Sequence, residues 1–224
     1  MSNRHSIIME NVSKSYAGRR VLDGVDLKVE KGQTVFLFGD NGSGKTSLLK
    51  IAAALTKPTG GRAETAGADT AKSAGDVRRK TGFASHEDCL YEDLSARANI
   101  RFFCALQKVA DPARRAGELI DMFEIARPDV PCRELSAGMK KRASIARAVA
   151  HSPEAVLLDE PFSGLDRAGG AIVSGLLRRL NAGGAAVLLS THRADRAPGL
   201  ADAAALLEGG VIARYGAFSE EFLP

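Results

Sequence analysis

The 224-residue sequence predicts an α/β fold built on a mostly parallel sheet. Three short and mostly apolar runs, at 35–38, 155–160 and 186–190, are typical of strands that are buried on both faces. Segments with apolar residues at helical spacing lie between these runs. Two alternating, β-branched segments at 7–12 and 25–29 predict a small antiparallel sheet ahead of the parallel one.

Composition limits the possible functions. Hydrophobic residues make up 45% of the chain and charged residues 26%, which is ordinary for a globular α/β protein. The longest apolar runs, such as 185–189, are far shorter than the ~20 residues of a membrane helix, and no signal peptide is recognisable. The net charge of +4 is spread along the chain, without a basic run interleaved with aromatic residues. We therefore expect a cytoplasmic protein that neither spans a bilayer nor binds nucleic acid.

The three cysteines do not predict a disulfide framework or a zinc site. Cys89, Cys104 and Cys132 are odd in number and widely spaced. A half metal site of His86 and Cys89 is disfavoured because no second ligand pair follows at matching spacing. We expect all three cysteines to be reduced.

Residues 39–46 read Gly-Asp-Asn-Gly-Ser-Gly-Lys-Thr and connect the strand at 35–38 to a helix predicted at 47–55. A strand, a glycine-rich turn ending in Gly-Lys-Thr and a helix form a P-loop, in which backbone N–H groups surround phosphate oxygens. Lys45 is then expected to reach the β- and γ-phosphates, and the Thr46 hydroxyl to ligate Mg²⁺. The candidate nucleotide-binding residues of this turn are Gly39, Asp40, Asn41, Gly42, Ser43, Gly44, Lys45, Thr46 and Ser47.

Two strands carry polar residues at their carboxyl ends. The run 155–160 ends in Asp159 and Glu160, and we expect this strand to lie beside the P-loop strand. Asp159 would there hold Mg²⁺ through water, and Glu160 would accept a proton from the attacking water; the alternative is a plain acidic turn. His192 follows the strand at 186–190, where it could contact the γ-phosphate or simply cap the strand.

The remaining chain supplies helices, short strands and a closing hairpin. Tyr16 precedes the P-loop by about two dozen residues; its ring could stack on adenine or be an ordinary core or surface tyrosine. His86 follows a short strand, and on spacing alone it is a solvated loop histidine. The further predicted elements are loops and short strands at 56–80, a strand at 81–84, helices at 94–103, 111–125 and 140–150, a helix through 172–180, and a hairpin of 202–207 with 211–214.

Together these motifs resemble the nucleotide-binding subunits of ATP-binding cassette (ABC) transporters, and the resemblance covers nearly the whole chain. The most specific signal is the run 135–139, Leu-Ser-Ala-Gly-Met, which is similar to the family's Leu-Ser-Gly-Gly-Gln signature. The resemblance implies a P-loop NTPase with a RecA-like, mostly parallel core at 1–85 and 151–224. It also implies an N-terminal antiparallel β subdomain and a helical subdomain inserted at 86–150.

The resemblance implies a subunit that binds and hydrolyses ATP with Mg²⁺ to power a transporter. In the family two such chains pack head to tail, so that Ser136 and Gly138 of one chain complete the γ-phosphate site of the other. Asp166 would cross that interface. The implied partners are a second copy or another ABC subunit and an integral membrane permease, which would hold the chain at the inner face of the cell membrane.

Three positions depart from the family pattern. His86 occupies the place of a glutamine that contacts Mg²⁺ and faces the membrane subunit, so protonation in mild acid is expected to lower activity. Ala137 replaces a glycine, which is tolerable where φ is negative. Met139 replaces the final glutamine of the signature. Because Lys45 and the other motif residues are present, we expect an active ATPase.

The subtype and two alternatives remain open at this point. The segments around 91–95 and 99–100 resemble ATPases of exporters whose membrane protein is a separate chain. Within this group of exporter ATPases, the chain is similar to the haem-exporter ATPase of cytochrome c maturation. The similarity lies at His86, in the run 135–138 and in the segments after Glu160 and Asp166. A soluble non-transport cassette ATPase would carry twin cassettes or a long coiled-coil insertion. A P-loop kinase would lack the 135–139 element.

Overall fold

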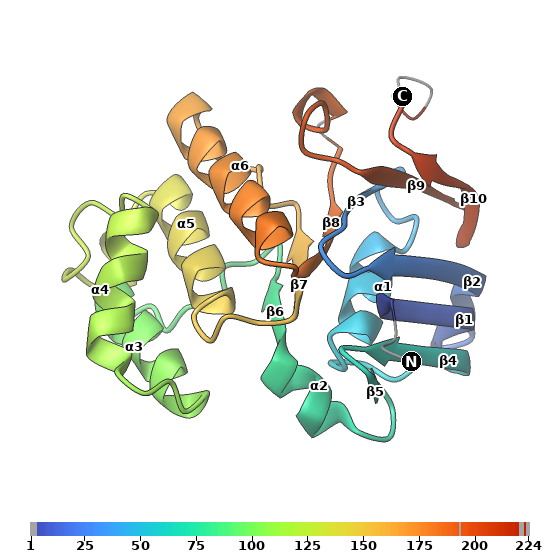
Figure 1. Ribbon diagram of the computed structural model, residues 1–224, viewed down its shortest axis with the longest axis horizontal. Coiled ribbons are helices and arrows are strands. Elements are labelled where there is room, and N and C mark those ends of the chain that lie inside the picture. The colour runs from blue at the N-terminus through green and yellow to red at the C-terminus, as the bar shows by residue number, and fades with distance from the viewer. Residues whose placement is uncertain (1–3, 193, 220–221, 223–224) are drawn as a thin grey trace.

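The computed structural model describes residues 4–192, 194–219 and 222 and contains two sheets with helices packed around them (Figure 1). The smaller sheet is antiparallel, with the strand order β2-β1-β4-β5. Its strands are β1 (His5–Tyr16), β2 (Arg19–Glu30), β4 (Gly60–Thr65) and β5 (Ala68–Asp69). The predicted N-terminal antiparallel sheet is therefore confirmed, and its first two strands are longer than the alternating segments suggested.

The larger sheet has the strand order β10-β9-β3-β8-β7-β6. All its strands are parallel to one another except β10, which pairs antiparallel with β9. Its strands are β3 (Thr34–Phe38), β6 (Thr81–Ala84), β7 (Ala155–Asp159), β8 (Ala186–Ser190), β9 (Ala203–Glu208) and β10 (Val211–Ala217). The prediction that β7 lies beside the P-loop strand β3 is wrong, because β8 runs between them.

The larger sheet is buried on both faces. Alternate side chains point to opposite faces of a strand, so β3 sends Phe36 and Phe38 into one core and Val35 and Leu37 into another. The first core lies among the helices that follow β6, and the second lies between the two sheets. Because both faces are covered, β3 reads as a continuous apolar run rather than as an alternating one.

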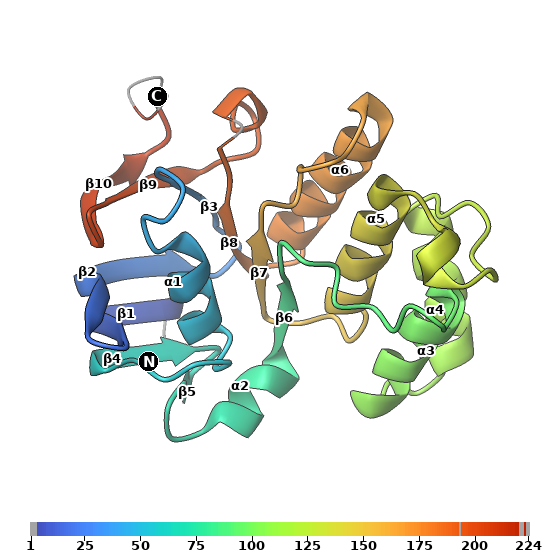
Figure 2. The ribbon, with the colours of Figure 1, turned by 180° about the vertical axis from the view of Figure 1, so that it is seen from behind.

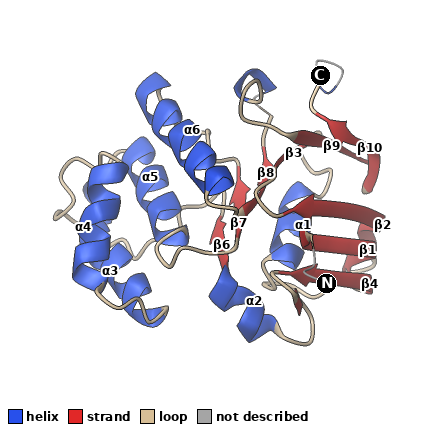
Figure 3. Cartoon of the chain, viewed as in Figure 1, coloured by secondary structure: helices blue, strands red, loops and turns tan. Residues whose placement is uncertain are grey.

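The helices divide between the two sides of the larger sheet (Figure 2). Helix α1 packs between the sheets, where it contacts β4, β7 and β8. Helices α3, α4 and α5 form a separate helical lobe, whereas the opposite end of the molecule is built of strands (Figure 3). The helices are α1 (Lys45–Ala52), α2 (Ala74–Lys80), α3 (Ala96–Leu106), α4 (Pro112–Met122), α5 (Ala137–Ala148) and α6 (Arg167–Ala182), with 3-10 turns at Cys132–Glu134 and Ala194–Arg196.

Side-chain caps fix where several helices begin. Ser95 caps α3 by accepting a hydrogen bond from the N–H of Ala98, and Asp111 likewise caps α4. Helix α2 is a correction, because residues 56–80 were expected to hold only loops and short strands. Val77 is the buried residue of this seven-residue helix, so its sequence has no apolar periodicity to detect.

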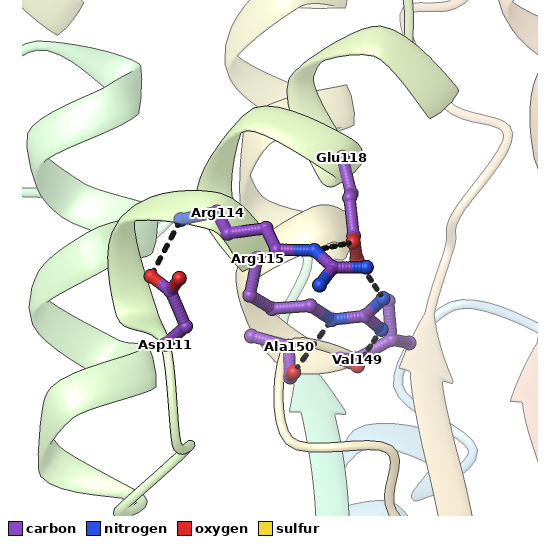
Figure 4. Close-up of polar contacts among 6 residues, drawn as sticks. All are labelled: Asp111, Arg114, Arg115, Glu118, Val149 and Ala150. Atoms are coloured by element: carbon purple, nitrogen blue, oxygen red, sulfur yellow. Dashed lines mark hydrogen bonds and ion pairs between the residues drawn. The ribbon is translucent and has the colours of Figure 1, made fainter.

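Arg115 joins α4 to the end of α5 inside the helical lobe (Figure 4). Its Nε donates to the carbonyl of Ala150 at 3.0 Å and its Nη2 to that of Val149 at 3.5 Å. Carbonyls at the end of a helix lack a partner within the helix, and a guanidinium supplies one. The lobe is thus held together partly by cations that bind main-chain oxygens.

Candidate nucleotide site

The turn that follows β3 has a shape that requires glycine. Gly39 and Gly44 have φ angles of 145° and 111°, in the region that side chains rarely adopt. A Cβ on Gly39 would also lie 2.3 Å from the carbonyl oxygen of Leu207, and one on Gly44 would lie 2.7 Å from the side chain of Leu22. The turn therefore follows a path that only glycine allows at these two positions, and it brings the backbone to the start of α1.

Lys45 lies at the start of α1 and is only 7% exposed. Its Nζ donates to the carbonyls of Gly39 and Asp40, at 2.6 and 3.0 Å. These acceptors belong to the same turn, so the ammonium is held over the loop rather than in the core. An ammonium in this place can transfer its hydrogen bonds to phosphate oxygens without any other element moving.

The turn opens into a cleft of about 500 Å³ that collects residues from distant parts of the chain. Most of the sequence-predicted P-loop residues line it, together with His86, Glu160 and His192. The lining residues are Val21, Asn41, Gly42, Gly44, Lys45, Thr46, Ser47, His86, Asp159, Glu160 and His192. The cleft lies at the carboxyl ends of the parallel strands, where open α/β sheets bind their ligands.

Two hydroxyls hold the carboxylate of Asp159, which is 2% exposed. Thr46 Oγ1 donates to Oδ2 at 2.8 Å, and Ser190 Oγ donates to Oδ1 at 2.5 Å. The carboxylate is thus placed beside the P-loop threonine, as a shared metal site requires. Mg²⁺ takes few protein ligands and fills its shell with water and phosphate oxygens. The donor set of Thr46 and Asp159 fits that preference.

Glu160 turns out of the strand immediately after Asp159. Its φ of 51° redirects the backbone, and its N–H donates to the Oγ and carbonyl of Ser190, at 3.1 and 3.2 Å. The Glu160 carboxylate is 12% exposed and lies 2.9 Å from Nδ1 of His192. The two neighbouring carboxylates therefore face different partners, a hydroxyl pair for Asp159 and an imidazole for Glu160. A carboxylate in this place can act as a general base.

Outside the phosphate-binding turn, four predicted site residues do not line the cleft. Tyr16 is 44% exposed at the end of the β1–β2 hairpin, with the Lys14 ammonium 4.8 Å from the centre of its ring. Ser136 caps α5, Asp166 caps α6, and Gly138 lies in the first turn of α5. Ser136 and Asp166 are exposed. Within one chain, the signature segment is therefore separate from the phosphate-binding turn.

The comparisons with known proteins decide the family. Residues 22–163, more than half of the chain, match the family model described as ABC transporter.

The chain belongs to the ABC transporter family.

Relatives of this ABC subunit include a drug resistance protein and a probable import protein. It is 36% identical over 220 residues to the daunorubicin resistance ATP-binding protein DrrA3 of Streptomyces coeruleorubidus, covering 96% of this chain and 69% of the relative. It is 34% identical over 219 residues to the probable sulfate/thiosulfate import ATP-binding protein CysA of Chlorella vulgaris, covering 96% of this chain and 92% of the relative.

A solved structure agrees with the fold and the chemistry. The ATP-binding cassette MJ0796, in a dimeric post-hydrolysis state bound to ADP and Pi, superposes with a TM-score of 0.89 at 28% identity, covering 95% of this chain and 99% of the other. The predicted fold class, with an antiparallel β subdomain and an inserted group of helices, is confirmed. The chain is an ATP-binding and ATP-hydrolysing subunit that energises an ABC transporter.

Two further findings concern the described residues. In the described ranges, no helix is long and apolar enough to cross a membrane. The cysteines Cys89, Cys104 and Cys132 are free, as expected. Burial raises the pKa of the Cys104 and Cys132 thiols, which keeps them protonated and unreactive.

Sequence reasoning missed two polar residues that hold this ABC site together. Ser190, buried completely, bridges Asp159 and the N–H of Glu160. Lys141 of α5 donates to the carbonyls of Ser85 and His86, at 3.2 and 2.7 Å. Burial lowers the pKa of Lys141, and the nearby charge of Asp88 opposes that shift. The sequence did contain one clue: Lys141 falls on the buried stripe of α5, whereas the other cationic residues of that helix do not.

Proposed function

We propose that this ABC ATPase works as a dimer in which each chain completes the nucleotide site of the other, and that it drives export through a separate membrane subunit. The observation that carries the proposal is the position of Ser136. Its hydroxyl is exposed at the start of α5 and outside the cleft that Lys45 lines. A second chain packed head to tail would bring its own Ser136 and Gly138 to that cleft. The dimeric form of a relative supports this arrangement.

In this proposal the P-loop side of the cleft holds the triphosphate. Lys45 exchanges the carbonyls of Gly39 and Asp40 for the β- and γ-phosphates. Thr46 and Asp159 would hold Mg²⁺, and His86, which lines the same cleft, would help to hold it. When bound, Mg²⁺ would supply positive charge at the phosphate oxygens, and Lys45 adds its ammonium to the same oxygens.

The other side of the cleft handles the attacking water. Glu160 accepts its proton, and His192 orients the Glu160 carboxylate, with which it makes a 2.9 Å contact. His192 also touches the γ-phosphate through its exposed edge. Asp166 faces the second chain, and Tyr16 stacks on the adenine ring. Hydrolysis then removes the charge that bridges the two chains, which releases the dimer.

A groove between the larger sheet and the helical lobe fits a helix of the membrane subunit. It measures about 310 Å³ and includes Leu55, Phe83 and Phe103, with Arg78 and Arg147 at its sides. Exposed Tyr91 and Phe102 lie 5.6 Å apart, between ring centres, next to it. Such an apolar groove with a cationic edge receives an amphipathic helix. The subunit would then sit at the inner face of the cell membrane.

Export is favoured by the resemblance of residues 91–95 and 99–100 to exporter ATPases, and by 33% identity over 205 residues to the Nod factor export ATP-binding protein I of Cupriavidus metallidurans. Haem export in cytochrome c maturation stays a prediction that rests on His86 and the run 135–138. A soluble, non-transport role is the alternative, and co-purification of a membrane chain separates the two.

The dimer is tested with Glu160→Gln, which removes the general base. Hydrolysis should slow by about 100-fold or more, so ATP persists and the dimer accumulates. Sedimentation velocity with ATP and Mg²⁺ should then show a dimer that is absent with ADP. Exposed Glu154, which pairs with Lys80 at 3.5 Å, supplies the matched control Glu154→Gln.

A further substitution checks whether Ser136 supplies the missing contact. Adding Ser136→Ala to the Glu160→Gln chain should return it to monomers at the same ATP concentration. A Glu160→Gln chain that stays monomeric in saturating ATP contradicts the proposal. A double mutant of Glu160→Gln and Ser136→Ala that still forms the dimer at the same ATP concentration also contradicts it.

A further inference from the structure

We infer that Lys141 is a positioning residue for ATP hydrolysis, which holds the main chain of residues 85–88 and thereby sets His86 at the edge of the nucleotide cleft. The inference rests on the proposed role of His86. It adds a residue outside the family's nucleotide motifs, on the buried side of the helix that begins at Ser136.

The burial of Lys141 singles it out. Among the described residues, the buried charged side chains are Lys45, Lys141 and Asp159. Two of these three line the nucleotide cleft, whereas Lys141 does not line it and bonds to the 85–88 segment. Burying an ammonium is costly unless hydrogen bonds and charge replace its water. A lysine at this position therefore needs strong hydrogen-bond partners, and its bonds to those partners fix their positions.

The contacts of Lys141 fix a backbone rather than a side chain. Its Nζ donates to the carbonyl of His86 at 2.7 Å and to that of Ser85 at 3.2 Å, and Asp88 Oδ1 lies 3.9 Å away. Two of the three N–H donors of the ammonium are thus bound to main-chain oxygens, and Asp88 adds a nearby opposite charge at a distance too long for a hydrogen bond. Because adjacent carbonyls are bound, both the position and the direction of the chain at His86 are set.

A second cation of α5 holds the same loop further along. Arg147 Nη1 donates to the carbonyl of Cys89, and its guanidinium lies 4.6 Å from the centre of the Phe103 ring. The loop is therefore attached to α5 on both sides of Glu87. Residues 85–89 leave β6 with no regular structure of their own, so these contacts replace a sheet or helix ladder. His86 is the residue of this loop that lines the cleft.

Lys141 also links His86 to the signature segment. Ser136 and Lys141 lie five residues apart on α5, or about 7.5 Å along a helix axis. One rigid element thus carries the hydroxyl offered to the second chain and the ammonium that holds His86. Placement errors of about 1 Å near reacting groups can cost up to about 100-fold in rate. Loss of the Lys141 contacts should therefore act on turnover more than on nucleotide binding.

The test compares Lys141→Met with Arg142→Met in the full chain. Arg142 is the next residue of the same helix, and its Nη1 also donates to two carbonyls, those of Phe123 and Glu124, both at 3.0 Å. These carbonyls lie in the helical lobe and not at the cleft. Lys141→Met should lower kcat by about tenfold with KM for ATP within about threefold of wild type, whereas Arg142→Met should leave kcat unchanged. Lys141→Arg, which keeps the charge and the donors, should recover most of the rate.

A double-mutant cycle separates positioning from general damage. If Lys141 acts through His86, adding Lys141→Met to His86→Ala should slow hydrolysis no further. If the two substitutions lower the rate of hydrolysis by independent factors that multiply in the double mutant, the inference is overturned while the proposed function stands. A Lys141→Met enzyme with wild-type kcat has the same consequence. If His86→Ala itself hydrolyses ATP like wild type, the proposed role of His86 fails and the inference fails with it. Should Lys141→Met not fold, the same cycle with Lys141→Gln distinguishes the same outcomes.

Discussion

Two buried lysines in this molecule make nearly the same contacts in different regions. Lys45 donates to the carbonyls of Gly39 and Asp40 in the phosphate-binding turn. Lys141 donates to the carbonyls of Ser85 and His86 in the loop that follows β6. The acceptors of Lys45 are five and six residues away in sequence, whereas those of Lys141 are 55 and 56 residues away.

The difference in sequence separation predicts a difference in function. A lysine bound to its own turn can release those carbonyls and take phosphate oxygens without disturbing another element. A lysine bound across the fold cannot move without moving the segment it holds. We therefore expect Lys45 to act on nucleotide directly and Lys141 to act through the loop at His86.

The largest effect is expected at Lys45. Lys45→Met should lower kcat/KM for ATP by about 100-fold or more, because a charge-assisted contact to the transferred phosphate is lost. Binding of ATP, followed by isothermal titration, should weaken as well, in contrast to Lys141→Met. Lys50→Met, in the last turn of the same helix, is the matched control. Wild-type affinity in Lys45→Met would remove the distinction between the two lysines.

The turn around Lys45 could be predicted from the sequence because its contacts are local. Each part of the site lies directly after an apolar run, and parallel strands bring their carboxyl ends to one edge. Lys45, Asp159 and His192 were placed at that edge on this basis. The neighbour of each strand could not be predicted in the same way. Nothing within β7 specifies that β8 rather than β3 lies beside it.

The region around Lys141 could not be predicted because its partners are main-chain atoms of a distant loop. A backbone carbonyl has no residue type, so no motif marks Ser85 or His86 as an acceptor. Ser190 was missed for a related reason, since its hydroxyl joins Asp159 to Glu160 from the neighbouring strand. Patterns identify groups that do chemistry, whereas groups that hold them appear only when the strands and loops are placed.

A smaller effect is expected at Ser190, which resembles Lys141 in holding a site residue from a distance. Ser190→Ala removes one of the two hydroxyls on the Asp159 carboxylate. A buried hydrogen bond to a charged group contributes about 1.5–3 kcal/mol, so the loss should lower kcat by about tenfold and raise the Mg²⁺ concentration needed for half-maximal activity. Magnesium titrations of the ATPase rate measure both.

The control for Ser190 is another fully buried serine. Ser144 Oγ has no hydrogen-bond partner among the described residues, and Ser144→Ala should leave the Mg²⁺ dependence unchanged. Equal effects of the two substitutions would mean that burial, rather than the bond to Asp159, is being measured.

The smallest effect concerns His151, a third basic residue near the end of α5. Both its ring nitrogens are shielded from solvent, and burial lowers the pKa of His151, against a smaller opposing influence of the Thr81 backbone. Below the usual histidine pKa of ~6.5, the unfolded chain therefore binds a proton that the folded chain resists. The free energy of unfolding should fall as the pH is lowered from about 7.5 to 5.5, and His151→Gln should reduce that fall. Urea denaturation at the two pH values measures the slope, and the same slope in both proteins would show that His151 titrates alike in the folded and unfolded chains.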